Sequence, residues 1–137
     1  MARDKFHQEV RQALEQEGWF ISDDPLYLKI GRIPIHIDLG AEKLIGAERN
    51  GEKIAVEVKT FSKSSFITAF HEAVGQYIVY REALEEMEVE RTLYLAIPAD
   101  TYEDYGEETL VQRVFRNNKI KVIIYEPSLI STLSWLK

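Results

Sequence analysis

The sequence predicts a single α/β domain, and three observations support that class. Helical and extended patterns alternate along the 137 residues, as they do in α/β proteins. Asn50-Gly51 separates two strand-like runs, which is typical of a β-hairpin. Apolar residues make up 45% of the chain and no stretch has low complexity. One core can therefore be buried, and we expect residues 1–137 to form one domain.

The first predicted elements are one helix and several short strands. Phe6, Val10 and Leu14 recur at helical spacing and Gly18 follows them, which predicts a helix over about residues 4–17. A turn is expected at residues 23–25. Short strands are expected at residues 26–30 and 33–37, and the hairpin strands at residues 43–49 and 53–60.

The second half of the chain alternates more regularly. Ser64 or Ser65 can cap a long helix that ends near Glu86, because serine is a good N-cap residue. A strand is expected over residues 92–97, a helix over 107–117 and a strand over 119–125. Residues 128–137 are expected to form a loose tail, apolar enough to contact a partner.

Composition excludes several classes of protein. The chain has no cysteine and only three separated histidines, so disulfides and thiolate zinc sites are excluded. Any bound metal would be a hard cation such as Mg²⁺ or Mn²⁺, held by carboxylate oxygens. No apolar run is long enough to span a bilayer and no signal-like segment begins the chain. We therefore expect a cytoplasmic protein with no membrane partner.

The net charge of −6 argues against indiscriminate binding of nucleic acid, because such affinity comes mainly from lysine and arginine. A local basic surface is still compatible with this charge. Lys63 and Arg81 are the predicted DNA contacts, since they lie close in sequence to Lys59 and Tyr80 of the candidate site.

The candidate site centres on Glu57-Val58-Lys59. Side chains alternate along a strand, so Ile54, Val56 and Val58 are expected to face a core while Glu57 and Lys59 share the other face. With Asp38 as a second carboxylate, this is the pattern of a metal site that cuts phosphodiesters. The carboxylates would bind the metal, and the lysine would orient water or meet the phosphate charge. The same residues are also compatible with a solvated strand face.

The hairpin register decides which carboxylate can reach Glu57. A two-residue turn at Asn50-Gly51 places Leu44 opposite Glu57 and Glu42 opposite Lys59. Asp38 then reaches the site only if the chain bends near Gly40. Glu42 is the alternative ligand, although its simplest role is a cross-strand salt bridge with Lys59.

Two further groups come from predicted helices. Gln76 and Tyr80 stand one turn apart and are expected beside the apolar stripe of the long helix, where they could hold a water or a phosphate oxygen. The alternative is that they are ordinary surface and core-edge residues. Glu9 lies on the first helix, away from Phe6 and Val10, and could reach the metal through water.

The order of these residues resembles the PD-(D/E)XK nuclease-like superfamily, in the branch with a Gln-x-x-x-Tyr helix. Longer stretches resemble the XisH family of fdxN element excision controlling factors from cyanobacteria. They are IDLGAEKLI at residues 37–45, EKIAVEVK at 52–59 and LYLAIP at 93–98. The segments 6–19 and 70–81 fit as well, so the resemblance runs from near the N-terminus to Tyr125.

The resemblance implies a restriction-endonuclease-like fold, a mixed sheet flanked by helices. It implies that Asp38, Glu57 and Lys59 are the metal carboxylates and lysine, and that Gln76 and Tyr80 are the helical pair. It also implies a role in DNA excision and recombination, with a XisI-like protein and a site-specific recombinase as partners. A homodimer is possible. Two hypotheses follow: a Mg²⁺- or Mn²⁺-dependent endonuclease, or a non-catalytic controlling factor that binds DNA or a protein.

Overall fold

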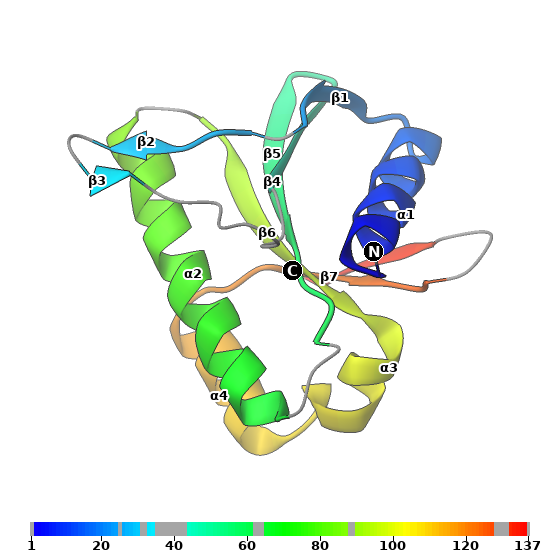
Figure 1. Ribbon diagram of the computed structural model, residues 1–137, viewed down its shortest axis with the longest axis vertical. Helices are drawn as coiled ribbons and strands as arrows, with labels where there is room; N and C mark the ends of the chain where they lie inside the picture. The colour runs from blue at the N-terminus through cyan, green and yellow to red at the C-terminus, as the bar shows by residue number, and fades with distance from the viewer. Residues whose placement is uncertain are drawn as a thin grey trace.

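A computed structural model describes residues 2–24, 26–30, 33–34, 44–61, 65–87, 90–127 and 132–136. Figure 1 shows their arrangement. In chain order, the helices and strands are α1 (Ala2–Gln16), β1 (Phe20–Asp23), β2 (Lys29–Ile30), β3 (Ile33–Pro34), β4 (Leu44–Arg49), β5 (Glu52–Val58), α2 (Phe66–Glu86), β6 (Thr92–Pro98), α3 (Ala99–Thr101), the π-helical turn η1 (Tyr102–Gly106), α4 (Thr109–Asn117), β7 (Val122–Tyr125) and β8 (Leu133–Leu136).

The main sheet has six strands in the order β1-β4-β5-β6-β7-β8. β5, β6 and β7 run parallel, and the neighbours at both edges are antiparallel. β2 and β3 pair separately. The predicted α/β class, a mixed sheet flanked by helices, is confirmed. No helix among the described residues is both long and apolar enough to cross a membrane.

Each face of the sheet is covered by its own core. Val10 and Leu14 of α1 pack with Ile54, Val56 and Val58 of β5 on one face. On the other face, helices α2 and α4 pack over Ala55 and the odd-numbered residues of β6. Because successive side chains of a strand alternate, Glu57 lies on the same face as Ala55, beneath α2. The predicted division of β5 into two faces is confirmed.

The hairpin between β4 and β5 forms as predicted. Asn50 and Gly51 have φ angles of 50° and 83°, the positive values that a two-residue type I′ turn requires. Leu44 pairs with Glu57 and Arg49 with Glu52, so the register deduced from the turn is confirmed. This register fixes which face of β5 carries Glu57.

Several predicted segments differ from the structure. β1 occupies part of the segment expected only to lead into a turn. α3 and η1 occupy residues 99–106, where no element was expected. The strand predicted at residues 26–30 is reduced to β2. Residues 33 and 34 of the strand predicted at 33–37 form β3, and residues 35–37 lie outside the described residues. The predicted loose tail contains β8, which pairs with β7.

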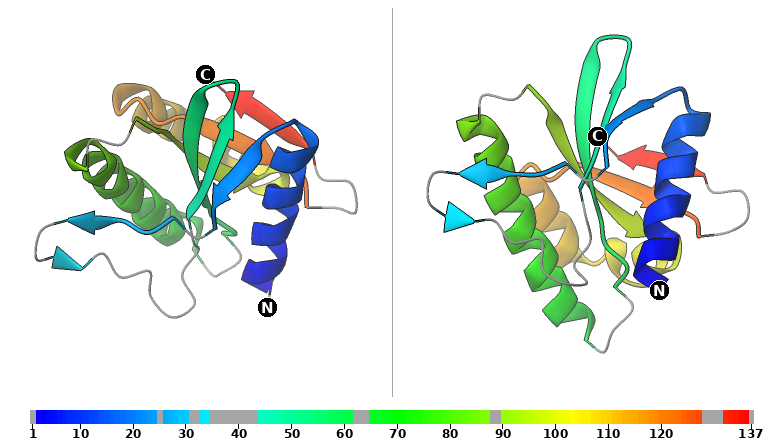
Figure 2. Two further views of the ribbon diagram at one scale, coloured as in Figure 1. Left: turned by 90° about the horizontal axis from the view of Figure 1, so that it is seen from above. Right: turned by 45° about the horizontal axis from the view of Figure 1, so that its top comes forward.

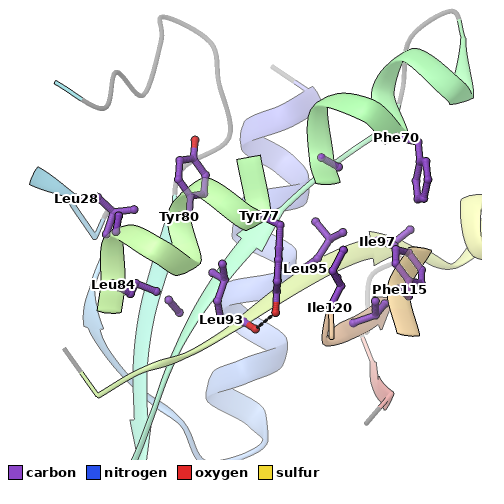
Figure 3. Packing of buried hydrophobic residues seen from close by; sticks show 14 of the residues in the cluster. Leu28, Phe70, Tyr77, Tyr80, Leu84, Leu93, Leu95, Ile97, Phe115 and Ile120 are labelled. Carbon is purple, nitrogen blue, oxygen red and sulfur yellow. Dashed lines mark hydrogen bonds between the residues drawn. The ribbon is translucent and has the colours of Figure 1, made fainter. Parts of the chain in front are cut away.

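α2 begins as predicted, because the Ser65 side chain accepts a hydrogen bond from the Thr68 amide at 3.3 Å. Its buried face meets the sheet through Tyr77, whose hydroxyl donates to the Leu93 carbonyl at 2.7 Å (Figure 3). The same hydroxyl accepts from the Lys121 amide at 3.2 Å. One side chain therefore ties α2 to β6 and to the residue before β7.

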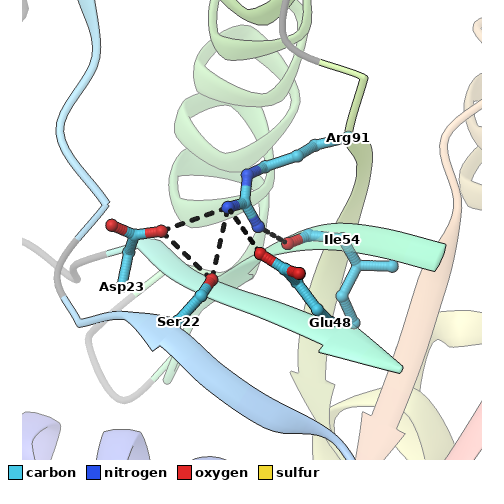
Figure 4. A network of polar contacts seen from close by, with 5 residues as sticks. All are labelled: Ser22, Asp23, Glu48, Ile54 and Arg91. Atoms are coloured by element: carbon cyan, nitrogen blue, oxygen red, sulfur yellow. Dashed lines mark hydrogen bonds and ion pairs between the residues drawn. The ribbon is translucent and has the colours of Figure 1, made fainter. Parts of the chain in front are cut away.

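Arg91, just before β6, binds the hairpin edge of the sheet (Figure 4). Its guanidinium donates to the Ile54 carbonyl at 2.9 Å and to Asp23 at 3.1 Å, and lies 3.9 Å from Glu48. Only 7% of its side chain is exposed. This arginine therefore joins β1, β4 and β5 through charge-assisted hydrogen bonds. Ile54 lies near the start of β5 and Lys59 follows its end, so Arg91 and Lys59 are at opposite ends of this strand.

Candidate functional site

The candidate site lies where β5 ends. Glu57 is buried, with 2% of its side chain exposed, and its carboxylate oxygen lies 3.7 Å from the Lys59 ammonium. Lys59 is also held by its backbone. Its amide donates to the Ala96 carbonyl at 3.0 Å, and its carbonyl accepts from the Tyr125 hydroxyl at 2.8 Å. Strands β6 and β7 therefore fix the position of this lysine.

Gln76 reaches the same point from α2. The Lys59 ammonium donates a hydrogen bond to the Gln76 side-chain carbonyl oxygen. The lysine side chain is only 12% exposed, so its charge is held in a largely desolvated position between a carboxylate and an amide. A buried ammonium held in this way can interact strongly with a negative charge placed beside it.

Tyr80 lies elsewhere than predicted. We expected it beside the apolar stripe of α2, but it is 8% exposed and belongs to the core cluster that also contains Leu28. Its ring packs in the cluster, and its hydroxyl points away from Leu93 (Figure 3). The prediction of its surroundings was wrong, because packing from the segment near β2 covers this part of the helix.

Glu9 is buried in α1, with 9% of the residue exposed. Both of its carboxylate oxygens are shielded from solvent and form no hydrogen bond within the described part of the chain. The first turns of α1 lie close to the end of β5, because the Phe6 ring packs edge-on against Tyr125 at 6.0 Å. Tyr125 in turn bonds to Lys59.

The other predicted site residues divide into two groups. Asp38, Glu42 and Lys63 lie outside the described residues. Arg81, a predicted DNA contact, donates to the carbonyls of Asn118 and Lys119 at 2.7 and 3.1 Å. The structure gives this arginine a role in holding the turn after α4, and its contact with DNA stays a prediction.

Sequence reasoning missed Tyr125, which anchors Lys59 from 66 residues away. Within the sequence Tyr125 ends an apolar run and carries no local signal of this bond. Only the pairing of β6 with β7 brings its hydroxyl to the end of β5.

The donor chemistry fits a hard cation, because Glu57 offers buried carboxylate oxygens. Within the described ranges, no three His, Asp or Glu side chains converge on one point. Glu57 would therefore be a ligand from the described chain, with Glu9 as a further candidate, and the predicted second carboxylate, Asp38 or Glu42, lies outside the described residues.

Comparison with known proteins gives two kinds of match. A family model described as XisH protein matches residues 1–131. A crystal structure of an XisH family protein from Nostoc punctiforme PCC 73102 is 42% identical, covers 97% of this chain and 99% of its own, and has a TM-score of 0.87. A structure of an fdxN element excision controlling factor protein from Anabaena variabilis is 40% identical, covers 98% and 99%, and has a TM-score of 0.88. No curated protein matches the chain.

Proposed function

Because this chain belongs to the XisH family, we propose that it takes part in excision of a DNA element through a metal-dependent endonuclease site at the end of β5. One observation carries the proposal. The Lys59 ammonium lies inside the protein against Glu57 and Gln76. A lysine with no role beyond a solvated surface would instead extend into solvent. The name of the Anabaena variabilis relative, an excision controlling factor, supports the process.

Each residue has a distinct role in this proposal. Glu57 and Asp38 would hold Mg²⁺ or Mn²⁺, with Glu42 or Glu9 as further ligands. Such a cation would lower the pKa of a water and offset charge on the phosphate. Lys59 donates from its ammonium to the attacked phosphate or to the water. Gln76 keeps that ammonium in place, and burial strengthens its interaction with the phosphate charge.

The test is cleavage of supercoiled and branched DNA by purified protein with Mg²⁺ or Mn²⁺. We expect Glu57→Gln and Lys59→Ala each to lower the rate by roughly 100-fold or more, the usual effect of removing one well-placed charged group. Lys53→Gln is the matched control, since Lys53 lies on the same strand with its side chain exposed. Cleavage that persists in Lys59→Ala would remove Lys59 from the mechanism.

A second function, a non-catalytic controlling factor, is favoured by the net charge of −6. An enzyme that grips duplex DNA would ordinarily carry more positive charge. In this role the nuclease-like scaffold binds DNA, a XisI-like protein or the recombinase. Wild-type protein that folds but cleaves nothing, and that forms a complex with a XisI-like protein in gel filtration with light scattering, would support it. The same measurement reports a homodimer.

Both functions would be carried out in the cytoplasm, where the DNA element is excised. The sources of the two matched structures, Nostoc punctiforme and Anabaena variabilis, support a cyanobacterial origin.

A further inference from the structure

A patch of positive charge lies on α4 and on the turn that follows it, apart from the candidate site. It consists of Arg113, Arg116, Lys119 and Lys121, which we call the α4 basic surface. All four residues are exposed. Residues 109–125 contain no Asp or Glu, although the whole chain has 23 acidic residues against 17 Lys and Arg. Ordinary surfaces mix charges of both signs, so this separation of charge calls for an explanation.

The four cations stand on the outward side of the helix and turn. α4 packs on the sheet through Val111 and Phe115, and Arg113 and Arg116, three residues apart, project on the opposite side. Within the described part of the chain, none of the four side chains takes part in an ion pair. Their charges are therefore available to a ligand.

Lys119 has an unusual backbone conformation for a lysine. Its φ of 53° lies in the left-handed region, at the position after a helix where glycine is strongly preferred. The Lys119 amide donates to the Arg116 carbonyl at 3.2 Å, and the Ile120 amide donates to the Phe115 carbonyl at 2.9 Å. This pair of bonds is the Schellman motif. A lysine kept where glycine is more stable points to a use for its side chain.

The turn is also held rigidly from behind. The Arg81 guanidinium donates to the Asn118 and Lys119 carbonyls and lies 5.3 Å from the centre of the Tyr77 ring. Tyr77 itself accepts from the Lys121 amide. α2 therefore fixes the backbone that presents Lys119 and Lys121, which lowers the entropy lost when they bind a ligand.

The geometry points to the α4 basic surface as the contact for the phosphates of duplex DNA. This inference rests on the proposed action on DNA, which selects DNA among polyanions. Sheet register supports it, because Glu57, Leu95 and Val122 stand in one row. β7 is two strands from β5, roughly 10 Å across the sheet. Lys121 immediately precedes Val122, so the chain that carries this surface enters the sheet two strands from the candidate site.

The experiment measures binding of a mixed-sequence duplex by fluorescence anisotropy in EDTA, where no metal-dependent cleavage occurs. Salt is varied between roughly 50 and 200 mM, since each phosphate contact adds ~0.9 to the slope of log affinity against log salt. We expect Arg113→Gln, Arg116→Gln, Lys119→Gly and Lys121→Gln each to lower the slope by about that amount. The combined variant should lose roughly tenfold or more in affinity.

Two controls separate binding from folding and from general charge. Lys119→Gly should bind DNA more weakly while its unfolding midpoint stays the same or rises, because glycine suits this turn better. Lys53→Gln, which removes an exposed lysine on β5, should leave the slope unchanged. If Lys53→Gln lowered the slope as much as the α4 variants do, DNA would be attracted by the overall charge of the protein and not by this surface, and the proposal would be overturned.

Other outcomes also test whether the α4 basic surface contacts DNA. Unchanged affinity in the combined variant, or no DNA binding by the wild type, overturns the proposal. The combined variant could instead lose DNA binding because a dimer dissociates, as light scattering would show. That outcome would overturn the proposal and make this surface an interface between copies of the chain. Intact binding without cleavage in Mg²⁺ would contradict the nuclease site alone and leave the α4 basic surface supported.

Discussion

The Tyr77 hydroxyl is a buried polar group with both a donor and an acceptor role. It donates to the Leu93 carbonyl and accepts from the Lys121 amide, and the residue is 1% exposed. Burial raises the pKa of this phenol above its ordinary value, against smaller lowering effects from the Lys121 amide and Arg81. The neutral form is therefore the one that the folded protein stabilises.

We predict that Tyr77→Phe lowers the free energy of unfolding by about 1–3 kcal/mol, because the buried Leu93 carbonyl and the part-buried Lys121 amide lose their partner. Tyr27→Phe is the control, since Tyr27 is 72% exposed, and it should change stability by less than about 0.5 kcal/mol. Urea unfolding of both variants measures the difference. Equal stabilities would contradict the assigned bonds.

The same residue predicts a dependence on alkaline pH. The pKa of Tyr77 is raised from 10.0, so the unfolded chain releases this proton first as pH rises. Its contribution to stability is complete below about pH 10 and is lost as pH rises through the folded pKa. Tyr94, whose pKa burial also raises, acts in the same direction. In urea unfolding at increasing pH, Tyr77→Phe should lose less stability than wild type above pH 10. An identical pH dependence would exclude Tyr77 as a source.

At the level of single side chains, strand alternation was enough to predict that Glu57 and Lys59 share a face. The distance between them and the Gln76 bond could not be predicted, because they depend on how α2 packs. Tyr80 was misplaced for the same kind of reason. Helical spacing defines a stripe, but Leu28, far away in sequence, packs in the cluster that buries Tyr80.

Among the helices, η1 depends on a close approach of its own backbone and Tyr102. A Cβ added at Gly106 would overlap the Tyr102 ring. Gly75, in the middle of α2, has open space around it. The two glycines therefore offer a matched pair in which the same substitution has opposite effects.

We predict that Gly106→Ala destabilises the protein by about 1–3 kcal/mol through overpacking. Gly75→Ala should stabilise it by about 0.5–1 kcal/mol, since alanine favours a helix interior. Thermal unfolding of the two variants beside wild type provides the measurement. A stabilising Gly106→Ala would mean that Tyr102 can move aside at little cost.

Elements with a local signal in the sequence were predictable, whereas β1 and β8 were not. α1, α2, α4 and the hairpin have repeated apolar spacing, a cap or a turn pair in the sequence. β1 and β8 have only four residues each, and their strand identity comes from pairing with β4 and β7. Such pairing is a property of the assembled sheet.

Across the whole molecule, β8 joins the two ends of the described chain. Trp135 stacks on Trp19 at 5.8 Å, meets Tyr94 edge-on at 5.0 Å and donates to Glu17 at 3.0 Å. β8 lies close to α1 although β1 and β8 are opposite edges of the sheet (Figure 2). Leu133 and Trp135 thus pack against the protein's own core, and a partner contact of this segment stays a prediction.

We predict that Trp135→Ala lowers the free energy of unfolding by about 3 kcal/mol, the usual effect of deleting a large packed aromatic side chain. Ser134→Ala is the neighbouring control. Its side chain is exposed, so a change below about 0.5 kcal/mol is expected. Guanidinium unfolding followed by tryptophan fluorescence and by circular dichroism measures both. A loss as small as that of Ser134→Ala would show that β8 adds little to the core.

The bond between Glu17 and Trp135 spans 118 residues of sequence, which bears on how the chain folds as it is made. During synthesis α1 leaves the ribosome long before the tryptophan that covers its end. Val10 and Leu14, fully buried in the finished core, lack part of that cover until residue 135 emerges. Contacts of such long range close slowly, so the part of this cover that Trp135 supplies is missing from the nascent chain until residue 135 emerges.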